Sequence, residues 1–136
     1  MEFIFIKVAE SRLGSINIFI TPDGAKAIYS SKVRTLIDAV YDWSRFNTLP
    51  NAYEWIRSFV QGDLSLCGDL IECCLLYGNQ ATIRRVGFLL NGLGAITEDL
   101  EKLRASLKSV KSVIPWRPDK PAKGRVNRVW GVIENE

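Results

Sequence analysis

Apolar residues in the first thirty positions follow the spacing of β-strands. Residues 3–6 are apolar at every position, which favours a strand that is covered on both faces. Isoleucine recurs at every second position over residues 16–20, and Thr21-Pro22-Asp23-Gly24 has the residue types of a tight turn. We therefore expect a hairpin with strands at 16–20 and 25–29, preceded by a strand at 3–6.

Between residues 31 and 108 the apolar positions change to helical spacing. After Ser31, a candidate N-cap, apolar residues recur at i, i+3, i+4 and i+7 from Val33 to Val40. The same kind of pattern predicts further helices over residues 51–60, 64–77, 80–93 and 96–108. The middle of the chain is therefore expected to be a set of four to five packed helices.

Several polar residues and one glycine in this region have expected positions of their own. Gly78 is placed to end one helix in a left-handed conformation, and Asn79 is placed to cap the next. On that next helix, Arg85 is expected to point away from the buried side. Arg34 and Asp38 lie four positions apart at the flank of the first apolar stripe, which predicts a surface ion pair.

The C-terminal part of the chain returns to strand patterns. Residues 112–116 form a short candidate strand, three prolines make the next segment extended and irregular, and residues 125–133 alternate again. The order of strands, helices and strands predicts an α+β fold for a single domain over residues 1–136. We expect the N-terminal hairpin strands and the C-terminal strands to form one small sheet.

Composition excludes most familiar catalytic classes. The 136 residues are 47% apolar and 24% charged, as in one globular domain, and contain no histidine, so Ser-His pairs, Cys-His pairs and histidine metal ligands are absent. The three cysteines, Cys67, Cys73 and Cys74, lie in one predicted helix and are expected to be buried, reduced and not metal-bound. No segment has the length of a membrane span or a signal peptide, which predicts a cytoplasmic protein without a membrane partner.

Charge is concentrated near the C-terminus. The formal net charge is +3, but residues 108–128 contain seven Lys or Arg against Asp119 alone, a net +6 that leaves −3 for the rest. Trp116 and Trp130 are interleaved with these cations, and cationic plus aromatic side chains favour phosphate contact and base stacking. The alternative is a solvated loop whose charge serves solubility, with both tryptophans in the core.

Motifs of catalysis are missing from the sequence. It has no P-loop, no Gly-x-Ser-x-Gly elbow and no lysine with an acid two positions before it, as a restriction-type nuclease would require. We therefore predict no catalytic residue, no metal site, no cofactor and no enzymatic activity. Two alternatives stay open: a divalent-metal nuclease or nucleotidyl-handling enzyme that uses acids such as Asp38 and Asp42, and a protein-interaction scaffold.

Three ordered segments carry a resemblance to a known family. Residues 31–38 (Ser-Lys-Val-Arg-Thr-Leu-Ile-Asp) resemble the Arg-x-x-x-Asp helix of AbiEi-type antitoxins from type IV toxin-antitoxin systems, which act in abortive infection. Tyr77-Gly78-Asn79 followed by residues 85–90 resembles their Tyr-Gly-Asn turn and the helix after it. Residues 118–133 resemble their closing Pro/Gly-rich basic loop and Trp-containing strand. The resemblance covers nearly the whole chain, as a C-terminal domain without the winged helix that precedes it in the family.

The resemblance implies a non-enzymatic antitoxin and transcriptional-regulator domain. In the family the winged helix binds operator DNA, and the C-terminal domain contributes to DNA contact and antagonises a nucleotidyltransferase toxin, whether or not the two bind directly. Basic residues of this chain are the DNA-contact candidates: Arg84, Arg85, Lys111, Arg117, Lys120, Lys123, Arg125 and Arg128.

Overall fold

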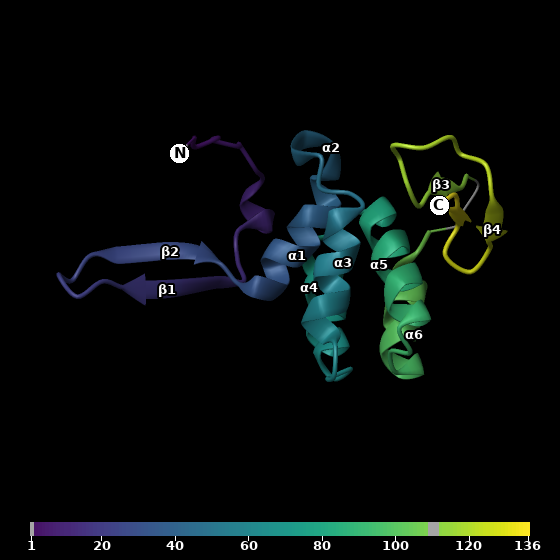
Figure 1. Cartoon of the computed structure of the whole chain (residues 1–136). Helices are drawn as coiled ribbons and strands as arrows, with labels where there is room; N and C mark the ends of the chain where they lie inside the picture. Colours follow the sequence, from purple (N-terminus) through teal and green to yellow (C-terminus); the bar gives the residue numbers. More distant parts are fainter. Residues whose placement is uncertain (1, 109–111) are drawn as a thin grey trace.

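The computed structural model describes residues 2–108 and 112–136, and it has an α+β fold, as predicted (Figure 1). The described helices are α1 (Lys32–Tyr41), α2 (Trp43–Phe46), α3 (Asn51–Val60), α4 (Leu66–Tyr77), α5 (Gln80–Gly92) and α6 (Thr97–Ser106), with a short 3-10 turn, η1, at Glu10–Arg12. The described strands are β1 (Ile16–Ile20), β2 (Lys26–Ser30), β3 (Ile114–Pro115), β4 (Arg125–Asn127) and β5 (Val132–Glu134).

The helices form the core of the molecule. Ile37 of α1, Ile56 of α3, Leu70 of α4, Leu90 of α5 and Leu103 of α6 are completely buried where these helices meet. Each such side chain contributes about 1.5–3 kcal/mol by leaving water. The predicted helical periodicity is therefore confirmed for the middle of the chain, with the short α2 as an addition.

Local capping explains where two of the helices begin. The Ser31 hydroxyl accepts from the Arg34 N–H at 3.1 Å, and Asn79 Oδ1 accepts from the Thr82 N–H at 2.8 Å, so both predicted N-caps are confirmed. The left-handed conformation predicted at Gly78 is wrong, because its backbone is extended (φ −79°, ψ 153°). Glycine suits this position because a Cβ there would lie only 2.6 Å from the Cys74 carbonyl oxygen.

The N-terminal hairpin stands away from the helices. β1 and β2 pair in antiparallel fashion with Ile18 opposite Ile28, and all ten of their residues are exposed. The strand expected at residues 3–6 is wrong, because these residues form no strand and the Phe5 side chain is 97% exposed. The N-terminal apolar residues therefore form no part of the described core.

A second, separate sheet lies at the opposite end of the molecule. β5 lies between β3, to which it is parallel, and β4, to which it is antiparallel. The helices separate this sheet from the hairpin, so the two ends of the chain do not share one sheet as expected (Figure 1). The strand expected over residues 125–133 is divided by a turn at 128–131, where Gly131 has a φ of +66° that favours glycine.

Candidate nucleic-acid interface

The C-terminal lobe, defined here as residues 112–136, is anchored to the helices by Trp116. Its indole ring stacks on the Tyr53 ring of α3 with centroids 3.6 Å apart and an interplanar angle of 4°. The Tyr53 hydroxyl donates to the Trp116 carbonyl at 2.8 Å, and Trp116 Nε1 donates to Glu136 Oε1 at 2.9 Å. Burial raises the pKa of the Tyr53 hydroxyl, which stays protonated and remains a donor.

Trp130 provides a second anchor on the face of α5. Its ring lies directly against Gly87, where any side-chain Cβ would collide with it, and its Nε1 donates to Asn91 Oδ1 at 3.1 Å. Trp116 and Trp130 are only 2% and 1% exposed. The stacking role considered for these tryptophans is therefore wrong, since both rings belong to the core.

Arg84 and Arg85 are also buried between α5 and the C-terminal lobe. An Arg84 guanidinium N–H donates to the Ser112 carbonyl at 3.0 Å, and one of Arg85 donates to the Pro115 carbonyl at 3.2 Å. Burial lowers the pKa of Arg85. The prediction that Arg85 points away from the core is wrong, and neither arginine faces solvent as a DNA contact requires. Their charge is used to hold backbone carbonyls of the lobe.

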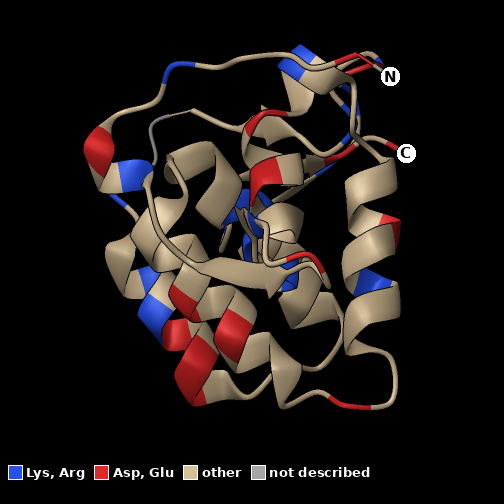
Figure 2. Ribbon diagram, turned by 90° about the vertical axis from the view of Figure 1, so that its left-hand side faces the viewer, with Lys and Arg blue, Asp and Glu red and all other residues tan. Residues whose placement is uncertain are grey.

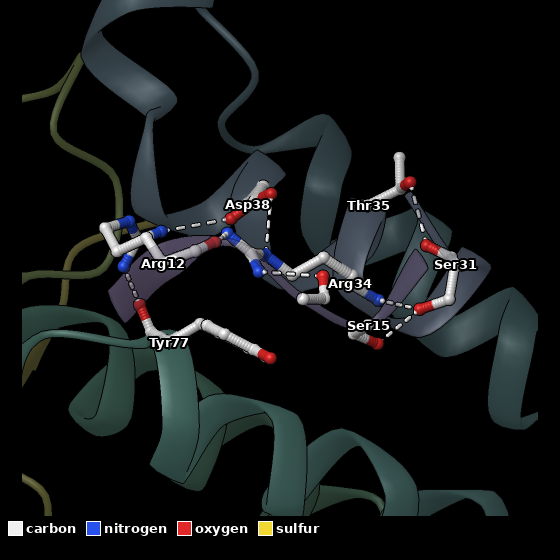
Figure 3. A network of polar contacts seen from close by, with 8 residues as sticks. Arg12, Ser15, Ser31, Arg34, Thr35, Asp38 and Tyr77 are labelled. Carbon is white, nitrogen blue, oxygen red and sulfur yellow. Dashed lines mark hydrogen bonds and ion pairs between the residues drawn. The ribbon is translucent and has the colours of Figure 1, made fainter. Parts of the chain in front are cut away.

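A second arginine cluster fixes the base of the hairpin (Figure 3). Arg34 Nε donates to Asp38 Oδ2 at 2.9 Å, and its terminal nitrogens donate to the carbonyls of Arg12 at 2.7 Å and Gly14 at 3.3 Å. The same guanidinium lies 3.8 Å from the centroid of the Tyr77 ring. Arg34 is buried, so the expected surface ion pair is instead a network that ties the hairpin to α1 and α4.

Arg12 completes this cluster and was not identified from the sequence. It donates to Asp38 Oδ1 at 3.2 Å and to the Tyr77 carbonyl, and its guanidinium stacks 3.6 Å from the centroid of the Tyr41 ring. Asp38, considered above as a metal-binding acid, thus accepts from two arginines. No local signal marked Arg12, because its partners lie 26 and 65 positions away.

Arg117 is paired within the lobe itself. Two of its guanidinium nitrogens donate to the two Asp119 oxygens at 2.8 and 2.6 Å. This interaction raises the pKa of Arg117 and lowers that of Asp119. Because the charges of Arg117 and Asp119 cancel, Arg117 adds little to the net positive charge of the lobe.

The remaining candidates form what we call the basic edge of the C-terminal lobe. Its members are Lys120, Lys123, Arg125 and Arg128, and all four are exposed. Within residues 2–108 and 112–136, none of the four has an acidic partner within 4.0 Å. Lys111, the last predicted contact, lies outside the described residues. The predicted cluster thus divides into two buried arginines, one self-paired arginine and four exposed cations.

Asn135 holds the loop that carries the basic edge. Its side-chain amide donates to the Arg117 and Pro121 carbonyls at 2.8 and 3.1 Å, while its oxygen accepts from the Arg117 N–H at 2.8 Å. Gly124 lies so close to the Glu134 carbonyl that no side chain would fit there. Asn135 was also missed from the sequence, because it lies one residue beyond β5 and no local pattern distinguishes this buried asparagine from an exposed one.

An open cleft of about 570 Å³ borders the C-terminal lobe but has a different chemistry. Phe88, Trp116 and Trp130 contribute its aromatic lining, and Arg57, Glu134 and Glu136 contribute its charged lining. Arg57 is already paired with Glu54 of its own helix. Because the two carboxylates would repel phosphate, the cleft is distinct from the basic edge and no phosphate contact is assigned to it.

The cysteines are buried as expected and lie apart from the basic edge. Cys67, Cys73 and Cys74 are free thiols, and burial raises the pKa of Cys73 to about 11. Among the described residues, no group of three or more His, Cys, Asp or Glu side chains is arranged to hold a metal ion. No described helix combines the length and apolar character needed to cross a membrane.

Comparisons with protein-family models, with curated proteins and with solved structures found no significant match for this chain. The resemblance to AbiEi-type antitoxins therefore stays a prediction from the motifs of the chain.

Proposed function

We propose that this chain is a non-enzymatic regulatory domain of the AbiEi antitoxin type, whose basic edge contacts DNA phosphates. The observation that carries this proposal is the set of four exposed cations, Lys120, Lys123, Arg125 and Arg128, none of which has an acid within 4.0 Å among the described residues. The carbonyl bonds of Asn135 hold the loop that displays the first two of them. A held loop loses less conformational entropy on binding than a free one.

The buried tryptophans determine what kind of DNA contact the basic edge makes. With Trp116 and Trp130 in the core, base stacking is not part of the interaction, and lysine and arginine bind the phosphate backbone without reading sequence. Each neutralised phosphate releases condensed counterions. Four contacts correspond to a slope of about −3 to −4 in a plot of log K against log salt concentration.

A salt titration of duplex binding tests this function. Fluorescence anisotropy with a labelled duplex should show the steep salt dependence, and Lys123→Ala combined with Arg125→Ala should make the slope less negative by about 2. The matched control is Lys102→Ala combined with Arg104→Ala, which removes the same charge from α6, where both residues pair with acids of their own helix. Equal losses in the two double variants would contradict a localised basic edge.

The antitoxin role requires a separate experiment. We expect the chain to be encoded beside a nucleotidyltransferase-like toxin and, when co-expressed with it, to restore growth. A rescue that needs no stable complex in a pull-down would fit an antitoxin that antagonises its toxin indirectly. Failure of rescue by the full chain with the neighbouring toxin would contradict the antitoxin role, while leaving phosphate binding to the anisotropy result.

One observation favours a second function, that of a protein-interaction module. The large apolar side chains of the hairpin are each more than half exposed. Exposed apolar patches on monomeric proteins usually mark contact sites, so the hairpin is a candidate surface for binding another protein. This function does not exclude DNA contact, since the hairpin and the basic edge lie at opposite ends of the molecule (Figure 1).

A further inference from the structure

The outer edge of β1 has none of the features that normally prevent strand pairing. Natural edge strands are protected by charged side chains, proline or bulges, whereas β1 reads Ile-Asn-Ile-Phe-Ile. The other edge of the hairpin, β2, carries Lys26. Figure 2, which views the molecule from the hairpin end, shows the hairpin ribbon almost entirely without charge. β1 is therefore the unprotected edge of the hairpin.

The hydrogen bonds of the hairpin show which groups of β1 face outward. The Ser31 N–H donates to the Ser15 carbonyl at 2.8 Å, and the Thr21 N–H donates to the Ala25 carbonyl at 2.9 Å. Hydrogen-bonded and non-hydrogen-bonded positions alternate along an antiparallel pair. Ile16, Ile18 and Ile20 therefore occupy the non-hydrogen-bonded positions, and their backbone N–H and C=O groups point away from β2.

These outward groups are complementary to those of a second β1 strand. An antiparallel pair related by a two-fold axis at Ile18 places Ile18 opposite its own copy and Ile16 opposite Ile20 of the other chain. The isoleucines that meet in this register all have outward backbone groups, so each isoleucine pair can exchange two hydrogen bonds, while Asn17 and Phe19 meet at the non-hydrogen-bonded positions between them. The isoleucine side chains of both strands also fall on the same face, in line with Ile28.

We propose that β1 is an interface between two copies of this chain, which join their hairpins into one four-stranded sheet across a two-fold axis at Ile18. A lone two-stranded hairpin is only marginally stable in water, and added strands stabilise it. Because β1 carries no charge, the two-fold axis places no like charges together. The network of Arg12, Arg34 and Asp38 holds the hairpin out from the helices, in a position where a second chain has access to it.

The available surface sets the strength of this association. Ile16, Ile18, Phe19 and Ile20 are 53%, 53%, 54% and 65% exposed. At on the order of 100 Å² of open apolar surface for each side chain, two β1 strands can bury at most about 800 Å² in total, which is the size of a weak, reversible interface. We therefore expect a dimer that forms at high protein concentration and dissociates on dilution.

Light scattering of the full chain after size exclusion tests the interface. The apparent mass should rise from the 15.3 kDa of one chain toward twice that value as concentration increases from micromolar to millimolar. Ile18→Lys should weaken the dimer by at least about tenfold, because two ammonium groups would meet at the axis. Ile28→Lys, on the same face but on β2, is the matched control and should weaken it by less than about threefold.

Mixing two variants tests the position of the axis. Ile18→Glu should also be monomeric, and an equimolar mixture of Ile18→Glu with Ile18→Lys should associate again, because opposite charges then meet across the axis. Circular dichroism confirms that both variants are folded. A chain that stays monomeric at millimolar concentration, an unchanged mass in Ile18→Lys, an equal effect of Ile28→Lys, or a mixture that stays monomeric would overturn the proposal.

This inference does not rest on DNA contact. The double variant Lys123→Ala and Arg125→Ala should dimerise as the unmodified chain does, so the two proposals fail independently.

Discussion

The N-terminal hairpin and the C-terminal lobe are both small β-structures attached to the same helices, yet they distribute their apolar and charged residues in opposite ways. In the lobe, Trp116 and Trp130 are buried and four cations are outside. In the hairpin, the apolar side chains are outside and β1 carries no charge. The comparison indicates that the lobe buries its large aromatic side chains against the helices of its own chain, whereas the hairpin has an apolar surface suited to a partner chain.

Buried arginines attach both regions, but in different surroundings. Arg34 donates to carbonyls at the base of the hairpin and also meets the Asp38 carboxylate. Arg84 and Arg85 donate to carbonyls of the lobe, and the Nε of each has no hydrogen-bond partner among the described atoms. The lobe therefore depends mainly on its aromatic anchors, while the hairpin depends on its ion-pair network.

The largest expected effect is the loss of stability when an anchoring side chain of the lobe is truncated, compared with truncation of an exposed side chain of the hairpin. Trp130→Ala should lower the free energy of unfolding by about 3–5 kcal/mol, because it removes a fully buried ring and leaves a cavity beside Gly87. Ile18→Ala in the exposed hairpin should change it by less than about 0.5 kcal/mol in the monomer. Urea titrations at low protein concentration measure the free energy of unfolding of both variants. Comparable losses in the two variants would contradict the difference in anchoring between the lobe and the hairpin.

A smaller difference is expected between the two kinds of buried arginine. Arg34→Met should cost about 2 kcal/mol, since it leaves Asp38 with one partner and two carbonyls without their donor. Arg85→Met should lower the free energy of unfolding by less than about 1 kcal/mol. It removes only one hydrogen bond, the 3.2 Å bond to the Pro115 carbonyl, and it also removes a buried charge whose Nε has no partner among the described atoms. Denaturant midpoints compare the two variants, and a reversed order would show that the lobe relies on Arg85 charge.

Hydrogen exchange localises the same effect. In Arg34→Met the amides of residues 15–31 should exchange faster while those of the C-terminal lobe keep their protection, because the substitution loosens only the hairpin base. Uniform acceleration across the chain would indicate global destabilisation instead.

A pH-dependent signal is also expected at the hairpin base. Burial raises the pKa of Cys73 from 9.0 to about 11, so the folded state holds its proton more tightly than the unfolded state. This contribution to stability is complete below pH 9 and is lost as the pH rises toward 11. Thiol labelling should therefore be slow in the folded chain near neutral pH and become faster in Arg34→Met, since Cys73, Ser15 and Ser31 line one pocket and a loosened hairpin base opens it.

Patterns within a few residues predicted much of the helical architecture. The N-caps at Ser31 and Asn79, the apolar stripe of α1 and the burial of the cysteines depend on contacts between near neighbours or on the general preference for burying small apolar groups. The hairpin turn was predictable for the same reason, because its residue types favour the tight geometry locally. The extended Gly78 shows the limit, since the chain passes there directly into the extended N-cap of α5 at Asn79.

The candidate site was only half predictable. The basic composition of residues 108–128 is a property of the sequence, but it did not distinguish Lys123, which is exposed, from Arg117, which is paired with Asp119. Asn135 and Arg12 carried no motif, although each makes several hydrogen bonds that shape a surface.

The sequence by itself determined the α+β class, the helical segments, the reduced buried cysteines and the excess of positive charge near the C-terminus. Only the tertiary structure decided that Arg84 and Arg85 face inward, that both tryptophans are core residues, and that the strands form two separate sheets. The physical reason is that burying an arginine requires a hydrogen-bond acceptor for its guanidinium, and here the acceptors are backbone carbonyls that only the folded chain brings close. Those carbonyls, at Ser112 and Pro115, lie 28 and 30 positions from the arginines that they accept from.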